Sequence, residues 1–262
     1  MMFRMGCQGP KGKKRAVLIT GGAVRIGAAV AEALARAGWG VVVHARGAVA
    51  EAEALCGRLR ALGAGAWHVR GDLARAGGSA DVFAAACAAA CGLDAVVNNA
   101  AVFSTRGAEG LTEEERLAMW RVNVEAPVEL TRCLWDHLRG RGARGCAVQM
   151  LDQRVARHGV GEGATPYVRS KCALAAYVRE AAAAMAPVLR VNAVAPGAVL
   201  APVAPDAREP AGAFPLGQRP TPEQVADAVR WLLDAEAVTG QTVFVDGGQS
   251  LGTHVAAARH KD

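Results

Sequence analysis

The sequence contains no apolar run of the roughly 20 residues that a membrane-spanning helix needs, although 52% of its 262 residues are hydrophobic. Its first residues, MMFRMGCQGPKGKKR, lack the apolar stretch and the small-residue cleavage site of a signal peptide. We therefore expect no membrane segment and a cytoplasmic protein. The length and composition predict one large α/β domain at residues 15–252, a disordered basic leader at 1–14 and a loose tail at 253–262.

The sequence also lacks the cysteine patterns of metal sites and disulfide frameworks. Its seven cysteines are odd in number and include no CxxC pair. Cys87 and Cys91 lie four residues apart in an alanine-rich stretch without nearby histidines. Reduced thiols of a cytosolic protein are therefore expected, and no metal ion.

Acidic residues are missing from the start of the chain, since none precedes Glu32. Five of the formal net charge of +6 come from Arg4, Lys11, Lys13, Lys14 and Arg15. A basic tail can bind nucleic acid, but the rest of the chain is nearly neutral. We interpret the leader as a solvated end and expect no nucleic-acid partner.

Short apolar runs alternate with helical patterns along the chain. We predict strands at residues 16–20, 40–45, 66–69, 93–100, 145–151, 189–195 and 242–245, and helices at 28–37, 48–62, 79–91, 112–138, 167–185 and 221–233. The helix at 112–138 is expected to bend at Pro127. This alternation predicts a parallel sheet of about seven strands with helices on both faces.

The first predicted strand leads into the glycine-rich turn TGGAVRIG (residues 20–27), which opens a helix. Glycines allow a backbone to approach a phosphate closely, and a helix N-terminus offers free N–H groups. The second strand ends in His44, Ala45 and Arg46, without the acid that would bind a ribose 2′-hydroxyl. An arginine there accommodates a 2′-phosphate, so NADP(H) is favoured over NAD(H). Alternatively, Arg46 is only a loop residue.

Polar residues at the ends of later strands point to the same edge of the sheet. Asp72 can bind an adenine amino group or cap the next turn. Asn98 and Asn99 can bind both backbone and cofactor. Asn123 lies within the predicted helix at 112–138 and either faces solvent or has a specific role. Because ligands bind beyond the carboxyl ends of parallel strands, we expect a single nucleotide-dependent site.

Tyr167 and Lys171 are spaced to lie one turn apart on one face of a helix. An ammonium near a phenol lowers the pKa of the phenol, which would make Tyr167 a general acid near neutral pH. Taken alone, this spacing is also found on ordinary solvated helix faces.

With these motifs in order, the chain resembles the short-chain dehydrogenase/reductase family. The matching segments are TGGAVRIG, Asp72, NNAA at residues 98–101, Asn123, YVRSK at 167–171 and Pro196-Gly197. The resemblance implies a single-domain Rossmann fold, hydride transfer with NADP(H), and a homo-oligomer, either dimer or tetramer. It assigns cofactor contacts to Gly21, Arg25, Ile26, Gly27, His44, Arg46, Asp72, Leu73, Asn99, Ala100, Ala101, Tyr167, Lys171, Pro196 and Gly197.

Three departures resemble the pteridine reductase branch, with its dihydromonapterin- and dihydrofolate-reducing members. Arg25 replaces the middle glycine of the turn, and Phe103 follows NNAA. No serine occurs between Ser104 and Ser170, and Asp152 stands where the catalytic serine is expected. This branch implies that Arg25, Phe103, Asp152 and Tyr167 bind a pterin.

The catalytic set implied by the resemblance is Tyr167, Lys171, Asp152 and Asn123, with the proton supplied by Tyr167 and Asp152 and a water chain held by Asn123. Asp152 lies fifteen residues before Tyr167, a longer spacing than the branch suggests. Two alternatives remain open: an NADPH-dependent carbonyl reductase in which Asp152 is a bystander, and a non-catalytic nucleotide-binding regulator. The Pro- and Ala-rich residues 198–219 are expected to form a loop over the pocket.

Overall fold

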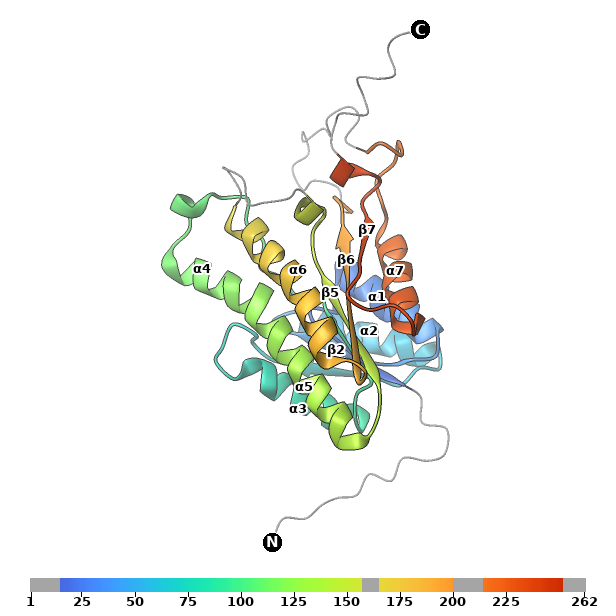
Figure 1. Ribbon diagram of the computed structural model, residues 1–262. Helices are drawn as coiled ribbons and strands as arrows, with labels where there is room; N and C mark the ends of the chain where they lie inside the picture. The colour runs from blue at the N-terminus through green and yellow to red at the C-terminus, as the bar shows by residue number, and fades with distance from the viewer. Residues whose placement is uncertain (1–14, 157–164, 200–213, 252–262) are drawn as a thin grey trace.

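A computed structural model describes residues 15–156, 165–199 and 214–251. They form one parallel sheet of seven strands in the order β3-β2-β1-β4-β5-β6-β7 (Figure 1). The predicted α/β architecture is therefore confirmed. The predicted leader and tail, and most of the predicted loop over the pocket, lie outside the described residues.

The helices and strands follow the predicted order. The strands are β1 (Ala16–Ile19), β2 (Gly40–Ala45), β3 (Ala66–Arg70), β4 (Ala95–Asn98), β5 (Gly145–Met150), β6 (Leu189–Pro196) and β7 (Thr242–Val245). The helices are α1 (Arg25–Arg36), α2 (Val49–Ala61), α3 (Gly78–Ala90), α4 (Glu113–Trp120), α5 (Ala126–Arg141), α6 (Pro166–Met185) and α7 (Pro222–Asp234). Short 3₁₀ turns η1 (Ala108–Gly110), η3 (Gln153–Ala156) and η4 (Gln249–Leu251) lie in the connections.

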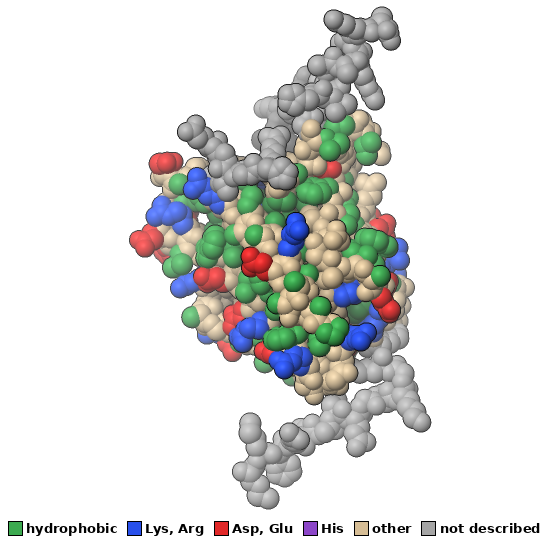
Figure 2. All heavy atoms as spheres, in the orientation of Figure 1, with side chains coloured by type: hydrophobic (Ala, Val, Ile, Leu, Met, Phe, Trp, Pro, Cys, Tyr) green, Lys and Arg blue, Asp and Glu red, His purple; other side chains and the backbone are tan. Residues whose placement is uncertain are grey.

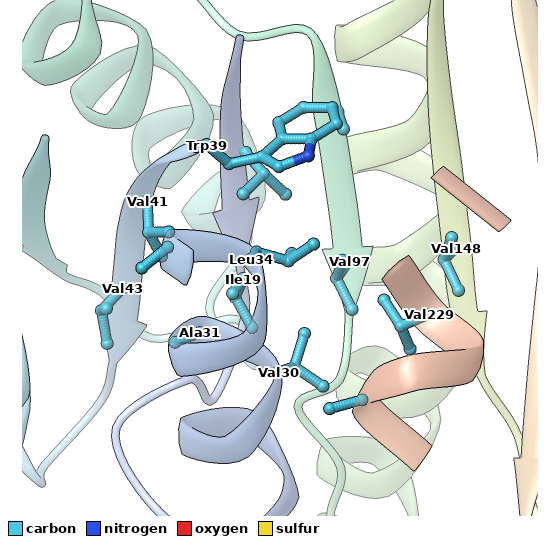
Figure 3. Packing of buried hydrophobic residues seen from close by; sticks show 14 of the residues in the cluster. Ile19, Val30, Ala31, Leu34, Trp39, Val41, Val43, Val97, Val148 and Val229 are labelled. Carbon is cyan, nitrogen blue, oxygen red and sulfur yellow. The ribbon is translucent and has the colours of Figure 1, made fainter. Parts of the chain in front are cut away.

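Both faces of the sheet are buried, which explains why its strands are continuous apolar runs rather than alternating ones. Val17 and Ile19 of β1 pack with α1, α2 and α7, whereas Leu18 packs with α3, α5 and α6. Figure 3 shows the first of these layers, where Leu34 of α1 and Val229 of α7 lie against the sheet. The sheet thus lies between two helical layers, and the loops that follow its strands start at its carboxyl edge.

The predicted helix at 112–138 is not regular, and its irregularity precedes Pro127. Thr112 and Glu115 form the expected capping box at its start. A π-helical turn, η2 (Arg121–Glu125), then separates α4 from α5. Pro127 has no N–H to donate to the carbonyl of Asn123, and its ring crowds that carbonyl, so a regular α-helix cannot pass through this point. Such turns are frequent at functional sites, and this one contains Asn123.

The outer face formed by α4, α5 and α6 carries charges of both signs interspersed with apolar side chains (Figure 2). Among the described residues, no helix combines the length and the apolar character needed to cross a membrane. The same residues include no cluster of three His, Cys, Asp or Glu side chains suited to a metal ion.

Candidate active site

A cleft of about 740 Å³ lies at the carboxyl edge of the sheet. Its walls come from the turn after β1, the loop after β4, the segment after β5, helix α6 and the loop after β6. Thirteen predicted site residues line it: Gly21, Arg25, Ile26, Gly27, Asn99, Ala100, Ala101, Phe103, Asp152, Tyr167, Lys171, Pro196 and Gly197. The predicted convergence on one site is therefore present.

The glycine-rich turn is closed tightly over the end of β4. The side-chain amide of Asn99 donates to the carbonyl oxygens of Thr20 and Gly21, both at 2.9 Å. A Cβ on Gly27 would collide with the Gly21 carbonyl and lie 2.7 Å from the Asn99 amide nitrogen. Only glycine at position 27 leaves room for this contact, so the turn and Asn99 form one unit.

Helix α1 begins directly below this turn and suits an anionic ligand. Its N-cap, Val24, supplies no side-chain hydrogen bond, and its first turn contains no acid. Free N–H groups at a helix N-terminus bind phosphate groups. Arg25 has a positive φ of 57°, a conformation that costs a non-glycine residue about 1–2 kcal/mol. This backbone explains why glycine suits the position and suggests that the arginine side chain has a function there.

His44 lies beneath the turn rather than in the cleft. Its Nδ1 accepts a hydrogen bond from the Gly21 N–H, and its Nε2 donates to the Gly71 carbonyl, both at 3.2 Å. Burial lowers the pKa of this imidazole, so the neutral form with hydrogen on Nε2 fits the contacts. Both ring nitrogens are thus occupied by backbone, and the ring supports the turn, which the sequence patterns do not reveal.

Three further predicted cofactor residues lie outside the cleft, along the neighbouring strand ends. Arg46 is exposed, and its carbonyl accepts a hydrogen bond from Nε of Arg70 at 3.3 Å. Asp72 accepts a hydrogen bond from the Ala74 N–H at 2.9 Å, which is the turn-capping contact considered from sequence. Leu73 is buried. Their roles toward a cofactor remain predictions.

Tyr167 and Lys171 lie on one face of α6, as their spacing predicts, and both are buried. The Lys171 ammonium donates to the Met150 carbonyl at 2.7 Å and lies 5.8 Å from the centre of the Tyr167 ring. Burial lowers the pKa of Lys171 to about 8. Burial, followed by the nearby Asp152 charge, raises the pKa of Tyr167. The expected lowering of the Tyr167 pKa is therefore wrong, because burial of the phenol and the Asp152 charge both favour its neutral form.

Asp152 stands beside Tyr167 despite the longer spacing between them in sequence. It follows β5 directly and forms a two-point ion pair with Arg154, from Nε to Oδ1 and from Nη2 to Oδ2, both at 2.8 Å. Its Oδ1 also accepts the Arg154 backbone N–H at 2.9 Å. The carboxylate lies close enough to the Tyr167 hydroxyl for its negative charge to contribute, after burial, to the raised pKa of Tyr167.

An aromatic pair forms the mouth of the cleft next to this ion pair. The rings of Phe103 and Tyr167 meet edge to face with centres 4.8 Å apart. Phe103 is 59% exposed, so more than half of its surface is open to a ligand. The Arg154 guanidinium lies 5.3 Å from the Tyr167 ring centre and 5.9 Å from that of Phe103.

Asn123 is fully buried and does not line the cleft. Its side chain exchanges two hydrogen bonds with the backbone of Val102, at 2.8 and 2.9 Å, and donates to the Ser170 hydroxyl at 3.0 Å. The solvent-facing alternative is therefore excluded. The contacts show Asn123 tying the loop after β4 to α6, while the predicted water chain to Lys171 stays a prediction.

Several residues lining the cleft have no recognisable sequence signal. Gln249 is one: its side-chain oxygen accepts the Ala198 N–H at 2.8 Å, and a Cβ on Gly197 would lie 2.5 Å from it. Arg154 is another, although its position two residues after Asp152 was visible in the sequence. The remaining unpredicted residues are Val24, Met150, Leu151, Gln153, Ala198 and Val199.

The doubly wound parallel sheet, the phosphate-type turn and the Tyr167–Lys171 pair in one cleft define a nucleotide-dependent oxidoreductase. A family model described as enoyl-(acyl carrier protein) reductase matches residues 22–250. The chain belongs to this family of short-chain dehydrogenases/reductases, which confirms the family predicted from its motifs.

Three proteins show what this chain is similar to. A dihydromonapterin reductase of Enterobacter sp. (strain 638) is 30% identical over 242 residues, covering 91% of this chain and 98% of the relative. The 3-oxoacyl-[acyl-carrier-protein] reductase of Aggregatibacter actinomycetemcomitans is 30% identical over 240 residues, covering 88% and 98%. The crystal structure of alternative dihydrofolate reductase 1 from Brucella canis, complexed with NADP, is 31% identical with a TM-score of 0.83, covering 94% and 98%.

Proposed function

We propose that this protein is an NADPH-dependent reductase of a dihydropterin-type C=N bond. The observation that carries the proposal is the Asp152 carboxylate beside the Tyr167 hydroxyl, in a cleft whose mouth exposes the Phe103 ring. The similarity to a dihydromonapterin reductase and to an alternative dihydrofolate reductase supports it.

The residues of the glycine-rich turn fit an NADP(H) cofactor. The uncapped N-terminus of α1 and the Arg25 side chain would hold its pyrophosphate, and Arg46 would accept the 2′-phosphate. When bound, the cofactor supplies the hydride. Lys171 and the Pro196-Gly197 bend would border the nicotinamide end, because both line the same cleft.

The side chains around Tyr167 in the cleft suit a planar nitrogen heterocycle. The exposed face of Phe103 offers a stacking surface for such a ring. A carboxylate accepts hydrogen bonds from ring N–H and amino groups, which Asp152 can do and a serine hydroxyl does less strongly. Reduction of a C=N bond also requires a proton at nitrogen. Tyr167 carries its proton at neutral pH, as a phenol ordinarily does, so it can serve as the acid.

A carbonyl reductase is the second candidate. A protonated Tyr167 suffices to donate to a ketone oxygen, and a 3-oxoacyl reductase is among the relatives at 30% identity. Asp152 would then only orient the substrate. The regulator hypothesis is set aside, because the chain belongs to an oxidoreductase family and its Tyr167 and Lys171 share the cleft.

The decisive experiment measures NADPH oxidation by the purified protein with dihydrobiopterin and dihydrofolate against a panel of simple ketones. We expect pterin turnover well above ketone turnover, and its loss in Tyr167→Phe with NADPH binding retained. The matched control is Tyr177→Phe, which changes the one other tyrosine of the chain, half-buried on the same helix. Ketone turnover alone would favour the second candidate, and an active Tyr167→Phe variant would refute the acid role.

We also propose that the protein is a cytoplasmic homo-oligomer, either a dimer or a tetramer. Free thiols at Cys56, Cys133, Cys146 and Cys172 suit a reducing compartment. Trp231 of α7 and Phe244 of the edge strand β7 are 51% and 39% exposed, so both apolar side chains are available to a second subunit. Light scattering of the purified protein measures the oligomer size, and a monomeric mass would refute this proposal.

A further inference from the structure

The proposed reaction requires Tyr167 to release a proton next to a carboxylate. A negative charge beside a phenol opposes formation of the phenolate, and the Asp152 charge raises the pKa of Tyr167 in this way. A serine at this position would add no such charge. The replacement of serine by aspartate therefore creates an electrostatic problem that another residue has to offset.

Arg154 has the contacts to offset it. Its guanidinium donates a hydrogen bond to each carboxylate oxygen of Asp152, both at 2.8 Å, and lies 5.3 Å from the centre of the Tyr167 ring. The Arg154 charge acts on the pKa of Tyr167 in the direction opposite to the charge of Asp152. The positive charge of Arg154 persists at every working pH, whereas the buried Lys171 has a pKa of about 8. With Asp152, Arg154 and Lys171 ionised, the site carries the net single positive charge that Lys171 alone would supply beside a serine.

We propose that Arg154 is a positioning residue, whose guanidinium fixes and neutralises Asp152 so that Tyr167 can release its proton to the substrate. This inference rests on the proposed function, since it takes Tyr167 as the proton donor.

The surroundings of Tyr167 leave this role to few groups. The charged side chains that act on it are Asp152, Arg154 and, on its own helix, Lys171. The other described neighbours that pack against its ring are apolar: Phe103, Val102, Leu111, Met119 and Val168. Arg25 lines the far side of the same cleft, in the glycine-rich turn.

The inference is tested first by titrating Tyr167 itself, without any substrate. The chain has two tyrosines, so in a Tyr177→Phe background the phenolate absorbance reports Tyr167 alone. Asp152→Asn removes the negative charge that opposes formation of the phenolate, so the titration midpoint of Tyr167 is expected to fall. Adding Arg154→Gln to that variant is expected to raise the midpoint again by about one pH unit, a tenfold change in proton affinity. Equal midpoints in the two variants would overturn the inference.

Turnover supplies the second test. Arg154→Gln is expected to lower kcat at least about tenfold, because the Asp152 charge then acts unopposed on Tyr167. Adding Asp152→Asn to Arg154→Gln should restore part of that loss, and Arg154→Lys, which keeps the charge, should lose less. The matched control is Arg169→Gln, an exposed arginine of α6 that lies outside the cleft. Because the loss of the Asp152 contact to substrate raises KM, the variants are compared by kcat at saturating substrate. A double variant with a lower kcat than Arg154→Gln would show that Arg154 only holds the segment after β5.

The two tests separate this inference from the proposed function. If the titration midpoint of Tyr167 is the same in the two variants and the protein reduces pterins, the role of Arg154 is refuted and the proposed function stands. If the Tyr167 midpoint differs between the two variants but the protein turns over no pterin or ketone, the proposed function is refuted, while the electrostatic coupling of Arg154 to Tyr167 stands. Circular dichroism of each variant establishes that it is folded. In the double variant, the side-chain amides introduced by Asp152→Asn and Arg154→Gln can form a neutral hydrogen bond in place of the ion pair.

Discussion

We expect Lys171 to lower the free energy of unfolding of the protein. It is the one lysine among the described residues, and its side chain is buried with its ammonium on the Met150 carbonyl. Burial in an apolar environment penalises the charged form, which lowers the pKa of Lys171 from 10.5 to about 8. We predict that Lys171→Met abolishes activity and makes the folded protein more stable at pH 7.

The size of this gain follows from the pKa change. Each pKa unit corresponds to about 1.4 kcal/mol, so the buried ammonium lowers the free energy of unfolding by about 3 kcal/mol at pH 7. The variant loses the hydrogen bond to Met150, and a buried carbonyl without a partner costs about 1 kcal/mol. A net gain of about 2 kcal/mol remains, which raises Tm by about 4–8 °C in a protein of this size.

The pH dependence gives the prediction its sharpest test. Between pH 8 and pH 10.5 the unfolded chain binds the Lys171 proton more tightly than the folded protein does, so this residue makes wild-type stability rise with pH across that window. The advantage of Lys171→Met should therefore be complete below pH 8 and shrink by about 2 kcal/mol at pH 9.5. Urea unfolding at pH 7 and 9.5 measures it, with Arg169→Met as the exposed control on α6. An equal advantage at both pH values, or a less stable variant at pH 7, would refute the reasoning.

Two further predictions concern the cofactor side of the cleft. Gly27→Ala should cost about 1–3 kcal/mol of stability and weaken NADPH binding, because its Cβ would lie 2.7 Å from the Asn99 amide nitrogen. The control Gly57→Ala, which has open space around it in helix α2, should stabilise the protein by up to about 1 kcal/mol. If the two variants changed Tm and the fluorescence of bound nucleotide equally, this prediction would be contradicted. Arg46→Asp should reverse the preference for NADPH over NADH, with a loss of about tenfold or more in kcat/KM for NADPH; an unchanged ratio of the two kcat/KM values would show that the exposed Arg46 does not bind the 2′-phosphate.

The features predicted well from the sequence are those that depend on local spacing. The buried strands read as continuous apolar runs because both sheet faces are covered. Tyr167 and Lys171 share a face of α6 because any helix places residues four apart on one side. The turn at residues 20–27 is likewise a local pattern, and Gly27 shows directly why glycine is needed there.

The features missed depend on partners that are distant in the chain. His44 supports the turn through Gly21 and Gly71, which lie 23 and 27 residues away. The π-helical turn places the Asn123 side chain on the backbone of Val102, 21 residues earlier. No periodicity records such contacts, because they exist only after the sheet has brought the loops together. For the same reason a pKa cannot be predicted from residue types: burial of Tyr167 raises its pKa, although the neighbouring Lys171 alone would lower it.

Asp152 shows how a local substitution reaches beyond its own position. With a serine there, the charge beside Tyr167 would come from Lys171 alone. With an aspartate, the same net charge requires a second cation, and that cation must be close enough to hold both carboxylate oxygens. Arg154 meets this condition because η3 turns the chain back directly after β5, which also lets its backbone N–H bind Oδ1 of Asp152. In the proposed mechanism the carboxylate and the arginine therefore act together, and Arg154→Gln alone, which leaves the Asp152 charge unopposed beside Tyr167, should perform worse than the variant that changes both residues.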